Sequence, residues 1–146
     1  MNKKATLLII FTLTIALTLA NVLISEGNGE KSFPKTMSIG NKTVTYEKEG
    51  KCLDVIDGNT IQVYGVGKVQ LTQIGSPTNE AKQFVEEKCL GKTVYLNIDD
   101  KQPKDEYKRT LAIVYTNTTD INKELIENNL AEISYFTPSE FKKGEI

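Results

Sequence analysis

The chain has 146 residues, of which 39% are hydrophobic, which is enough for one modest domain. Its formal net charge is −1, with 18 basic against 19 acidic residues, and this balance argues against a protein that coats nucleic acid with a broad basic face. A local basic cleft is still compatible with it. The sequence contains no histidine, which excludes every nucleophilic or general-base mechanism that depends on one.

Lys3 and Lys4 precede an uncharged, apolar run over residues 5–24, which we expect to be helical. Two interpretations stay open for residues 1–24. One is a cleaved signal peptide with Thr18-Leu19-Ala20 as its small-residue site; the other is an uncleaved membrane anchor, because about 20 apolar residues can span a bilayer. We favour the anchor. The two lysines predict that the N-terminus stays in the cytoplasm and that the rest of the chain faces outside.

The polar segment 25–42 contains three glycines and Pro34 and shows no sustained hydrophobic period. We interpret it as a linker between the membrane segment and a single folded domain over residues 43–146. At the start of that domain Val44 and Tyr46 alternate with polar residues. This alternation indicates a leading strand or an extended arm.

Residues 51–77 carry the alternation of apolar and polar side chains that is typical of half-buried strands. Turn sequences at 57–59 and 65–67 divide the segment. We therefore expect two short strands and then a third that runs into Pro77. Their apolar positions are Val55, Ile61, Val63, Val69, Leu71 and Ile74.

After Pro77 the hydrophobic period changes to that of a helix, with Ala81, Val85 and Cys89 on one face. Ser76 is predicted as the N-cap of this helix, and Gly91 as the residue that ends it.

The rest of the chain predicts two more strands and a second helix. Alternation indicates strands over 93–98 and 111–115, with an exposed turn at 99–104 between them. The helix that follows places Leu125 and Leu130 inward, and Asn129 takes a left-handed cap position at its end. Five strands with a helix between the third and the fourth fit a mainly β, α+β fold: a Greek-key barrel of the oligonucleotide- and oligosaccharide-binding (OB) type.

Four short motifs occur in order: DGNT at 57–60, QLTQIGSPT at 70–78, DEYKRTLA at 105–112 and NKELIENNLA at 122–131. Together they resemble the staphylococcal nuclease, or thermonuclease-like, family over roughly residues 50 to 137. The resemblance implies a five-stranded OB-fold barrel. It also implies calcium-dependent hydrolysis of phosphodiesters, in which two aspartates and a threonine carbonyl hold the ion, a glutamate activates water and two arginines neutralise the phosphate.

The residues at the catalytic positions depart from that pattern. The metal-ligand positions implied by the resemblance hold Asn59, Gly75 and Ser76, so both charged ligands are missing and we expect no metal to bind. Gln70 stands at the first arginine position and Thr78 at the glutamate position. The remaining arginine, Arg109, is the only arginine in the chain; it is either a remnant phosphate contact or a structural ion pair with Asp105.

Tyr107 and Tyr135 match family positions at which aromatic rings meet the nucleotide, and such rings can hold a single strand by stacking. The alternative is that both are half-buried barrel aromatics. Cys52 and Cys89 likewise leave two interpretations open. They form a disulfide in an exported chain, or they are buried hydrophobes.

We therefore expect an exported, membrane-anchored or secreted domain that is catalytically inactive, needs no cofactor and binds single-stranded nucleic acid or an envelope protein. A first alternative is a weak or altered calcium-dependent phosphodiesterase acting on DNA or RNA, with Glu80 replacing the lost glutamate. A second alternative is a structural domain of the cell envelope.

Overall fold

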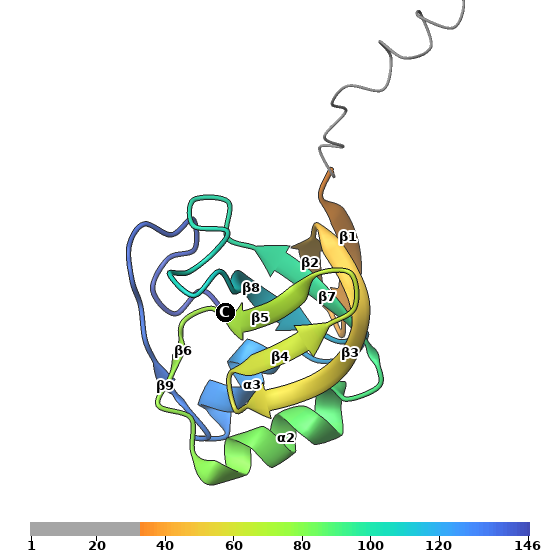
Figure 1. Cartoon of the computed structure of the whole chain (residues 1–146). Helices are drawn as coiled ribbons and strands as arrows, with labels where there is room; N and C mark the ends of the chain where they lie inside the picture. Colours follow the sequence, from red (N-terminus) through yellow and green to blue (C-terminus); the bar gives the residue numbers. More distant parts are fainter. Residues whose placement is uncertain (1–32) are drawn as a thin grey trace, which may run out of the picture. The chain divides into compact units, whose positions relative to one another are not determined.

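The computed structural model describes residues 33–146, so the signal or anchor predicted for residues 1–24 and its hydrophobic helix lie outside the described part. The core of the fold is a closed barrel in the order β3-β4-β5-β8-β7 (Figure 1). All neighbouring strands are antiparallel except β5 and β8, which are parallel. The predicted five-stranded OB barrel is confirmed. Its strands are β3 (Lys48–Asp57), β4 (Thr60–Val63), β5 (Gly67–Leu71), β7 (Thr93–Ile98) and β8 (Thr110–Tyr115).

The barrel forms because apolar side chains alternate along its strands. Ile61 and Val63 of β4 and Val69 and Leu71 of β5 point into the interior and are buried, whereas the residues between them face outward. The described helices lie outside the barrel and pack mainly on β3, β8 and β6. Within residues 33–146 no helix is long and apolar enough to cross a bilayer.

The third strand ends earlier than predicted. β5 stops at Leu71, and Gln73 has a left-handed backbone with φ 60°, so the chain turns before Pro77 is reached. Beyond this turn β6 (Ile74–Gly75) pairs with β9 (Glu132–Ile133) in a separate two-stranded sheet. The turn is held from outside the segment, because the Gln73 side chain bonds to the backbone of residues 142 and 144.

The first helix, α2 (Asn79–Cys89), begins three residues after the predicted cap. Ser76 has a left-handed backbone, φ 44°, whereas an N-cap residue is extended; Thr78, with φ −71° and ψ 170°, takes the cap position without a side-chain hydrogen bond. The prediction for Ser76 is therefore wrong. The predicted buried face is confirmed for Ala81, Val85 and Cys89, and Gly91 follows the helix with φ 74°.

The second helix, α3 (Ile121–Glu127), is capped by Asp120, whose Oδ1 accepts from the N–H of Lys123. Asn129 has φ 55°, so its predicted left-handed conformation is confirmed. Asn122 is fully buried; it accepts from the N–H of Val114 and donates to the carbonyl of Thr72, which ties α3 to the barrel.

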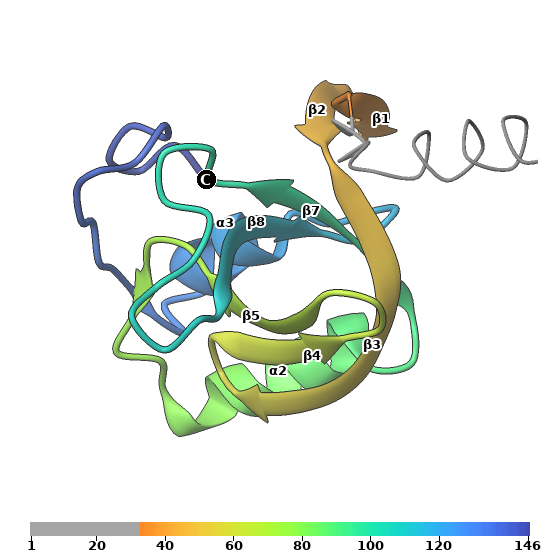
Figure 2. The ribbon, with the colours of Figure 1, turned by 45° about the horizontal axis from the view of Figure 1, so that its top comes forward.

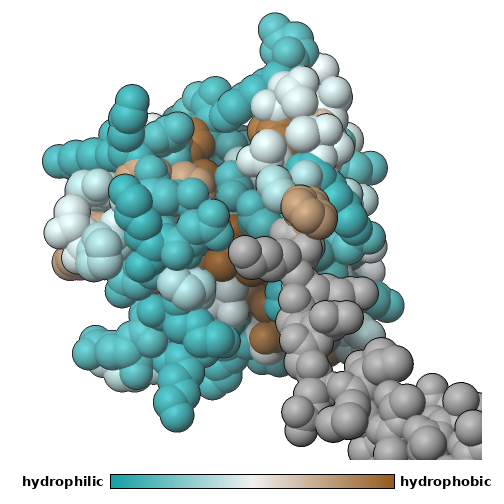
Figure 3. All heavy atoms as spheres, turned by 90° about the horizontal axis from the view of Figure 1, so that it is seen from above, coloured by the Kyte–Doolittle hydropathy of each residue, from teal (hydrophilic) through white to brown (hydrophobic). Residues whose placement is uncertain are grey.

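Part of the predicted polar linker is a β-hairpin. β1 (Lys35–Ile39) pairs with β2 (Lys42–Tyr46) around a two-residue turn in which Gly40 has φ 60°. The hairpin continues into the long strand β3 and stands beside β7 (Figure 2). Val44 packs in a small second core with Ile113, Tyr115 and Phe141. Seen from above in Figure 3, the surface is mainly hydrophilic and its apolar areas are small.

Cys52 and Cys89 are both fully buried in the main core as free thiols. Burial raises the pKa of both thiols, that of Cys89 to about 12. The backbone of Cys52 bonds to Gly91 and Lys92, so β3 lies beside the end of α2. Both cysteines thus pack as buried hydrophobic residues of the main core. A disulfide between them stays a prediction.

The cap of α3 also carries a buried charge. Oδ2 of Asp120 has no hydrogen-bond partner within residues 33–146, and the nearest cation is the Nζ of Lys42 on the hairpin, 3.9 Å away. Burial raises the pKa of Asp120 above 3.8 despite the helix N–H that donates to it and the lysines nearby. Ionising this carboxyl therefore costs stability as the pH rises from the pKa of the unfolded chain through the raised folded value.

Asp120→Asn is expected to remove this cost and keep the cap, because Asn caps helices as well as Asp does. Relative to the wild type, the variant should gain free energy of unfolding as the pH rises from about 4 to 7. Denaturant unfolding at several pH values measures this. Asp120→Ala is the matched control: it lacks the same carboxyl and also the cap, so it should lie about 1 kcal/mol below Asp120→Asn at every pH. A wild type whose advantage over Asp120→Asn grows with pH would contradict the assignment.

Candidate functional site

A cavity of about 460 Å³ opens beside the end of β5. Its walls come from three parts of the chain: residues 70–74, the loop 99–109 and the segment 134–139. These walls carry two highly exposed rings, Tyr107 and Phe136, which are 72% and 73% exposed. The volume is that of a pocket for one small organic group.

The loop beside the cavity is organised by Asp105. Its Oδ1 accepts from the N–H groups of Tyr107 and Arg109, both at 2.9 Å, and its Oδ2 accepts from Nε of Arg109 at 2.7 Å. Burial opposes ionisation of Asp105, but the hydrogen bonds and charge of Arg109 outweigh it and lower the pKa of this carboxyl. Arg109 therefore takes part in the predicted structural ion pair. Its guanidinium also lies 5.3 Å from the centre of the Tyr107 ring.

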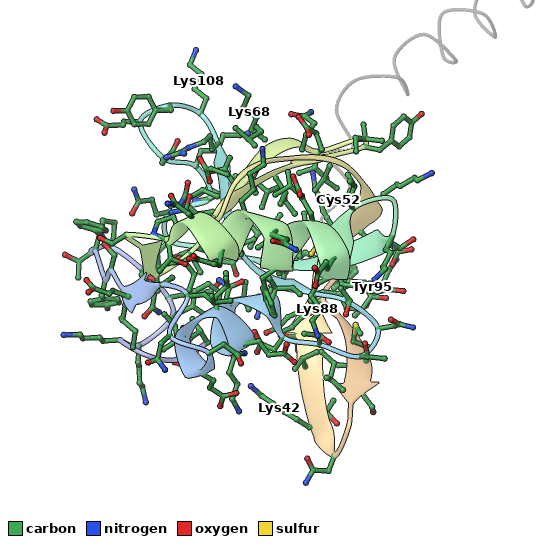
Figure 4. The ribbon with its side chains drawn as sticks, turned by 90° about the horizontal axis from the view of Figure 1, so that it is seen from below. Lys42, Cys52, Lys68, Lys88, Tyr95 and Lys108 are labelled. Carbon is green, nitrogen blue, oxygen red and sulfur yellow. The ribbon has the colours of Figure 1, made fainter. Side chains whose placement is uncertain are left out.

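Lys108 holds this loop in a conformation that a lysine rarely adopts. Its φ is 63°, in the left-handed region, and its side chain projects outward from the edge of the domain (Figure 4). In this region a side chain strains the backbone by about 1–2 kcal/mol, and glycine does not carry that strain.

Lys108→Gly is thus expected to raise the free energy of unfolding by up to about 1 kcal/mol, since relief of strain exceeds the greater entropy of the unfolded glycine chain. Thermal unfolding followed by circular dichroism tests this. Lys104→Gly in the same loop is the control: Lys104 does not have a positive φ, so its replacement should be destabilising. Equal losses for the two variants would show that Lys108 is unstrained.

Thr60 brings three of the predicted site residues together. Its hydroxyl oxygen accepts from Nη1 of Arg109 at 3.3 Å and lies 3.0 Å from Oε1 of Gln70 and 3.2 Å from Oδ1 of Asn59. The single hydroxyl proton of Thr60 can be donated to either of these two amide oxygens. Thr60, Asn59 and Gln70 thus form an uncharged hydrogen-bond network, to which Arg109 adds a charge that Asp105 balances.

Asn59 is turned away from the role of a metal ligand. Its Nδ2 donates to the carbonyl of Ile74 at 2.8 Å, and its backbone N–H donates to Oδ1 of Asp57 at 2.9 Å. The amide thus links the β3–β4 turn to β6. A carboxylate at residue 59 could not donate the first of these bonds.

Gly75 is closely covered by the segment that follows β9. A Cβ added to Gly75 would lie 2.5 Å from Cβ of Ser134 and 3.1 Å from its Oγ. Real side chains do not approach so closely, so the second metal-ligand position has no room for an aspartate. Among residues 33–146, no three or more acidic or cysteine side chains cluster closely enough to hold a metal ion. The calcium site that the resemblance implies therefore does not fit these residues.

The other predicted site residues divide into two groups. Gln70, Tyr107 and Arg109 line the cavity. Ser76 and Thr78 lie just before α2 and do not line the cavity. Tyr135 does not line it either, whereas its neighbour Phe136 does.

Two residues that support the cavity were not predicted. Asp99, expected in an exposed turn, is only 1% exposed; its carboxylate accepts from the N–H groups of Lys101, Gln102 and Glu140 and from the hydroxyl of Ser139. Gln73 uses both ends of its amide to hold the C-terminal segment. The sequence carries no local signal that Asp99 and Gln73 bond to the C-terminal segment, because those partners lie about 40 and 70 residues away.

Comparison with known proteins agrees with this fold. Residues 67–145 match the family described as staphylococcal nuclease homologue. The thermonuclease of Staphylococcus hyicus is 34% identical over 108 residues, covering 64% of this chain and 63% of that protein. This chain thus spans less than two thirds of that relative's length. With a barrel of the expected topology and a family match over more than half of its residues, the chain belongs to the staphylococcal nuclease homologue family.

Proposed function

We propose that this domain binds a single-stranded nucleic acid without hydrolysing it. The observation that carries the proposal is the pair of contacts at the lost metal ligands. The Asn59 amide is bonded to the Ile74 carbonyl, and Ser134 fills the space where a side chain of Gly75 would lie. Calcium affinity follows the number of charged oxygen ligands, and neither position supplies one.

Loss of the other catalytic groups supports the same conclusion. Gln70 cannot form charged, bidentate bonds to a phosphate, and the charge of Arg109 is balanced by Asp105 at 2.7 Å. Thr78, at the position of the general base, caps α2 instead. Each such loss typically lowers the rate about 10²- to 10⁴-fold, so the combined losses leave no useful hydrolysis.

Binding needs none of the missing groups. Tyr107 and Phe136 offer exposed rings at the cavity, and stacking of bases on aromatic rings holds single strands of any sequence. Amide and hydroxyl groups of Gln102, Ser134 and Thr137 line the cavity and can bond to the edge of a base. The ligand group that suits this cavity is therefore a base rather than a phosphate.

The test uses the full chain in detergent and a fluorescent oligothymidylate of about 12 nucleotides, within the range that one OB fold occupies. We expect binding that is unchanged by a calcium chelator, with no cleavage on a sequencing gel. Tyr107→Ala and Phe136→Ala should each weaken binding by about fivefold or more. Phe33→Ala is the matched control, because Phe33 is an exposed ring that does not line the cavity.

Failure of the folded chain to bind any oligonucleotide would overturn the proposal and favour a structural envelope domain. Cleavage that needs calcium would overturn it in favour of a phosphodiesterase.

We also propose that residues 5–24 place this domain at the outer side of a membrane. This proposal rests on the apolar run and the two preceding lysines. The full chain should stay with the membrane fraction at alkaline pH and remain open to protease from outside. Release into the medium with a new N-terminus near residue 21 would show a cleaved signal peptide instead.

A further inference from the structure

The β4–β5 hairpin presents a polar outer face that leads away from the cavity. Thr60 and Gln62 of β4 stand opposite Gln70 and Lys68 of β5, and Tyr64 continues the β4 series at the hairpin tip. The alternate residues of both strands are buried in the barrel core. Since successive side chains of a strand point to opposite sides, this set shares the outer face.

This outer face is continuous with the cavity. Thr60 at the cavity end is buried, Gln62 and Gln70 are half-buried, and Lys68 and Tyr64 farther along are exposed. Gln70 lines the cavity, and Thr60 bonds to Arg109. The described helices pack mainly on β3, β8 and β6, and none lies in front of β4 and β5 in Figure 1. Because β5 runs parallel to β8 with Val69 beside Thr110, Lys68 lies near the start of β8. Figure 4 shows Lys68 and Lys108 projecting at the same edge.

Two side chains on this face have the chemistry to hold a nucleotide. The Tyr64 ring is 71% exposed and directly precedes a turn in which Gly65 and Gly67 both have positive φ. Lys68 is exposed and takes part in none of the ion pairs within residues 33–146. The path from Gln70 past Lys68 to Tyr64 covers about four residue steps of roughly 3.4 Å, or about 14 Å. That length corresponds to two or three nucleotides of an extended strand.

Resting on the proposed binding function, we propose that the outer face of the β4–β5 hairpin is a second nucleic-acid subsite, in which Lys68 contacts a phosphate and Tyr64 stacks on a base two or three nucleotides from the cavity. Asp54 of β3 lies opposite Gln62 and is exposed, so its negative charge repels the phosphates of a nucleic-acid strand that follows this path.

Binding of oligothymidylates from two to about ten nucleotides to the full chain in detergent tests the subsite. For the wild type, affinity should rise between two and about five nucleotides and then level off. Tyr64→Ala should weaken binding of the longer oligomers about fivefold or more and leave dinucleotide binding unchanged. Tyr64→Phe should restore the long-oligomer affinity, because it keeps the ring.

Lys68→Ala should reduce the slope of log affinity against log salt by about 0.7 for the long oligomers only. Asp54→Asn should strengthen their binding. Lys82→Ala on α2 is the matched lysine control and should change neither value; Lys82 is paired with Glu86 away from this face. Dinucleotide binding without any gain on lengthening, or equal losses for short and long oligomers in Tyr64→Ala, would overturn the subsite alone. No binding at any length would overturn the proposed function as well.

Discussion

Asp99→Ala should lower the free energy of unfolding by about 3–5 kcal/mol, the range for removal of a buried charged group on which several donors depend. The carboxylate is 1% exposed and accepts three backbone N–H groups at 3.0 to 3.1 Å, as well as the hydroxyl of Ser139. Without it these donors are left unsatisfied. Urea unfolding of the wild type and the variant measures the difference.

The same change should weaken ligand binding, because Asp99 joins two walls of the cavity. It holds the start of the loop 99–109 and, through residues 139 and 140, the segment that carries Phe136. Ser139→Ala is the graded control: it removes one of the four bonds and should cost about 1–2 kcal/mol. A loss below 1 kcal/mol in Asp99→Ala would show that the two walls are held by other contacts.

Gly75→Asp is expected to destabilise the domain by about 3 kcal/mol, the upper end of the usual cost of overpacking. Its Cβ would meet Cβ of Ser134 at 2.5 Å, and the pairing of β6 with β9 fixes both backbones. Ser134→Gly in the same chain should recover most of this loss, because it removes both atoms that the new side chain would meet.

A double-mutant cycle that combines Gly75→Ala with Ser134→Gly separates the steric part of the destabilisation from the effect of the aspartate charge. We expect a large coupling energy between residues 75 and 134. Additive effects would show that the segment after β9 moves aside without cost.

The barrel could be predicted because its signals are local. Alternation along β4 and β5 and the helical period of α2 each lie within a dozen residues. The hairpin β1–β2 also had a local signal, the Gly40-Asn41 turn with Met37 paired to Val44 across it, but the polar composition of the segment obscured it.

The corrections concern positions that distant contacts determine. The backbone of Ser76 is left-handed next to the β6–β9 pairing, so it cannot act as the cap that its side chain suggests. Tyr135 and Phe136 are adjacent aromatics, and a difference of one residue in an extended segment turns the other ring toward the cavity. The bond from the Ser134 N–H to the Gln73 carbonyl anchors this segment, and no sequence pattern reveals it.

Titration of the full chain with a labelled single strand, in calcium and in a chelator, distinguishes a binding domain from a nuclease when the same samples are run on a gel. We predict equal affinity in the two conditions and intact oligonucleotide throughout, with weaker binding in Tyr107→Ala. Calcium-dependent cleavage that is lost in Arg109→Ala would contradict this prediction, because it would show a working active site built around the remaining arginine.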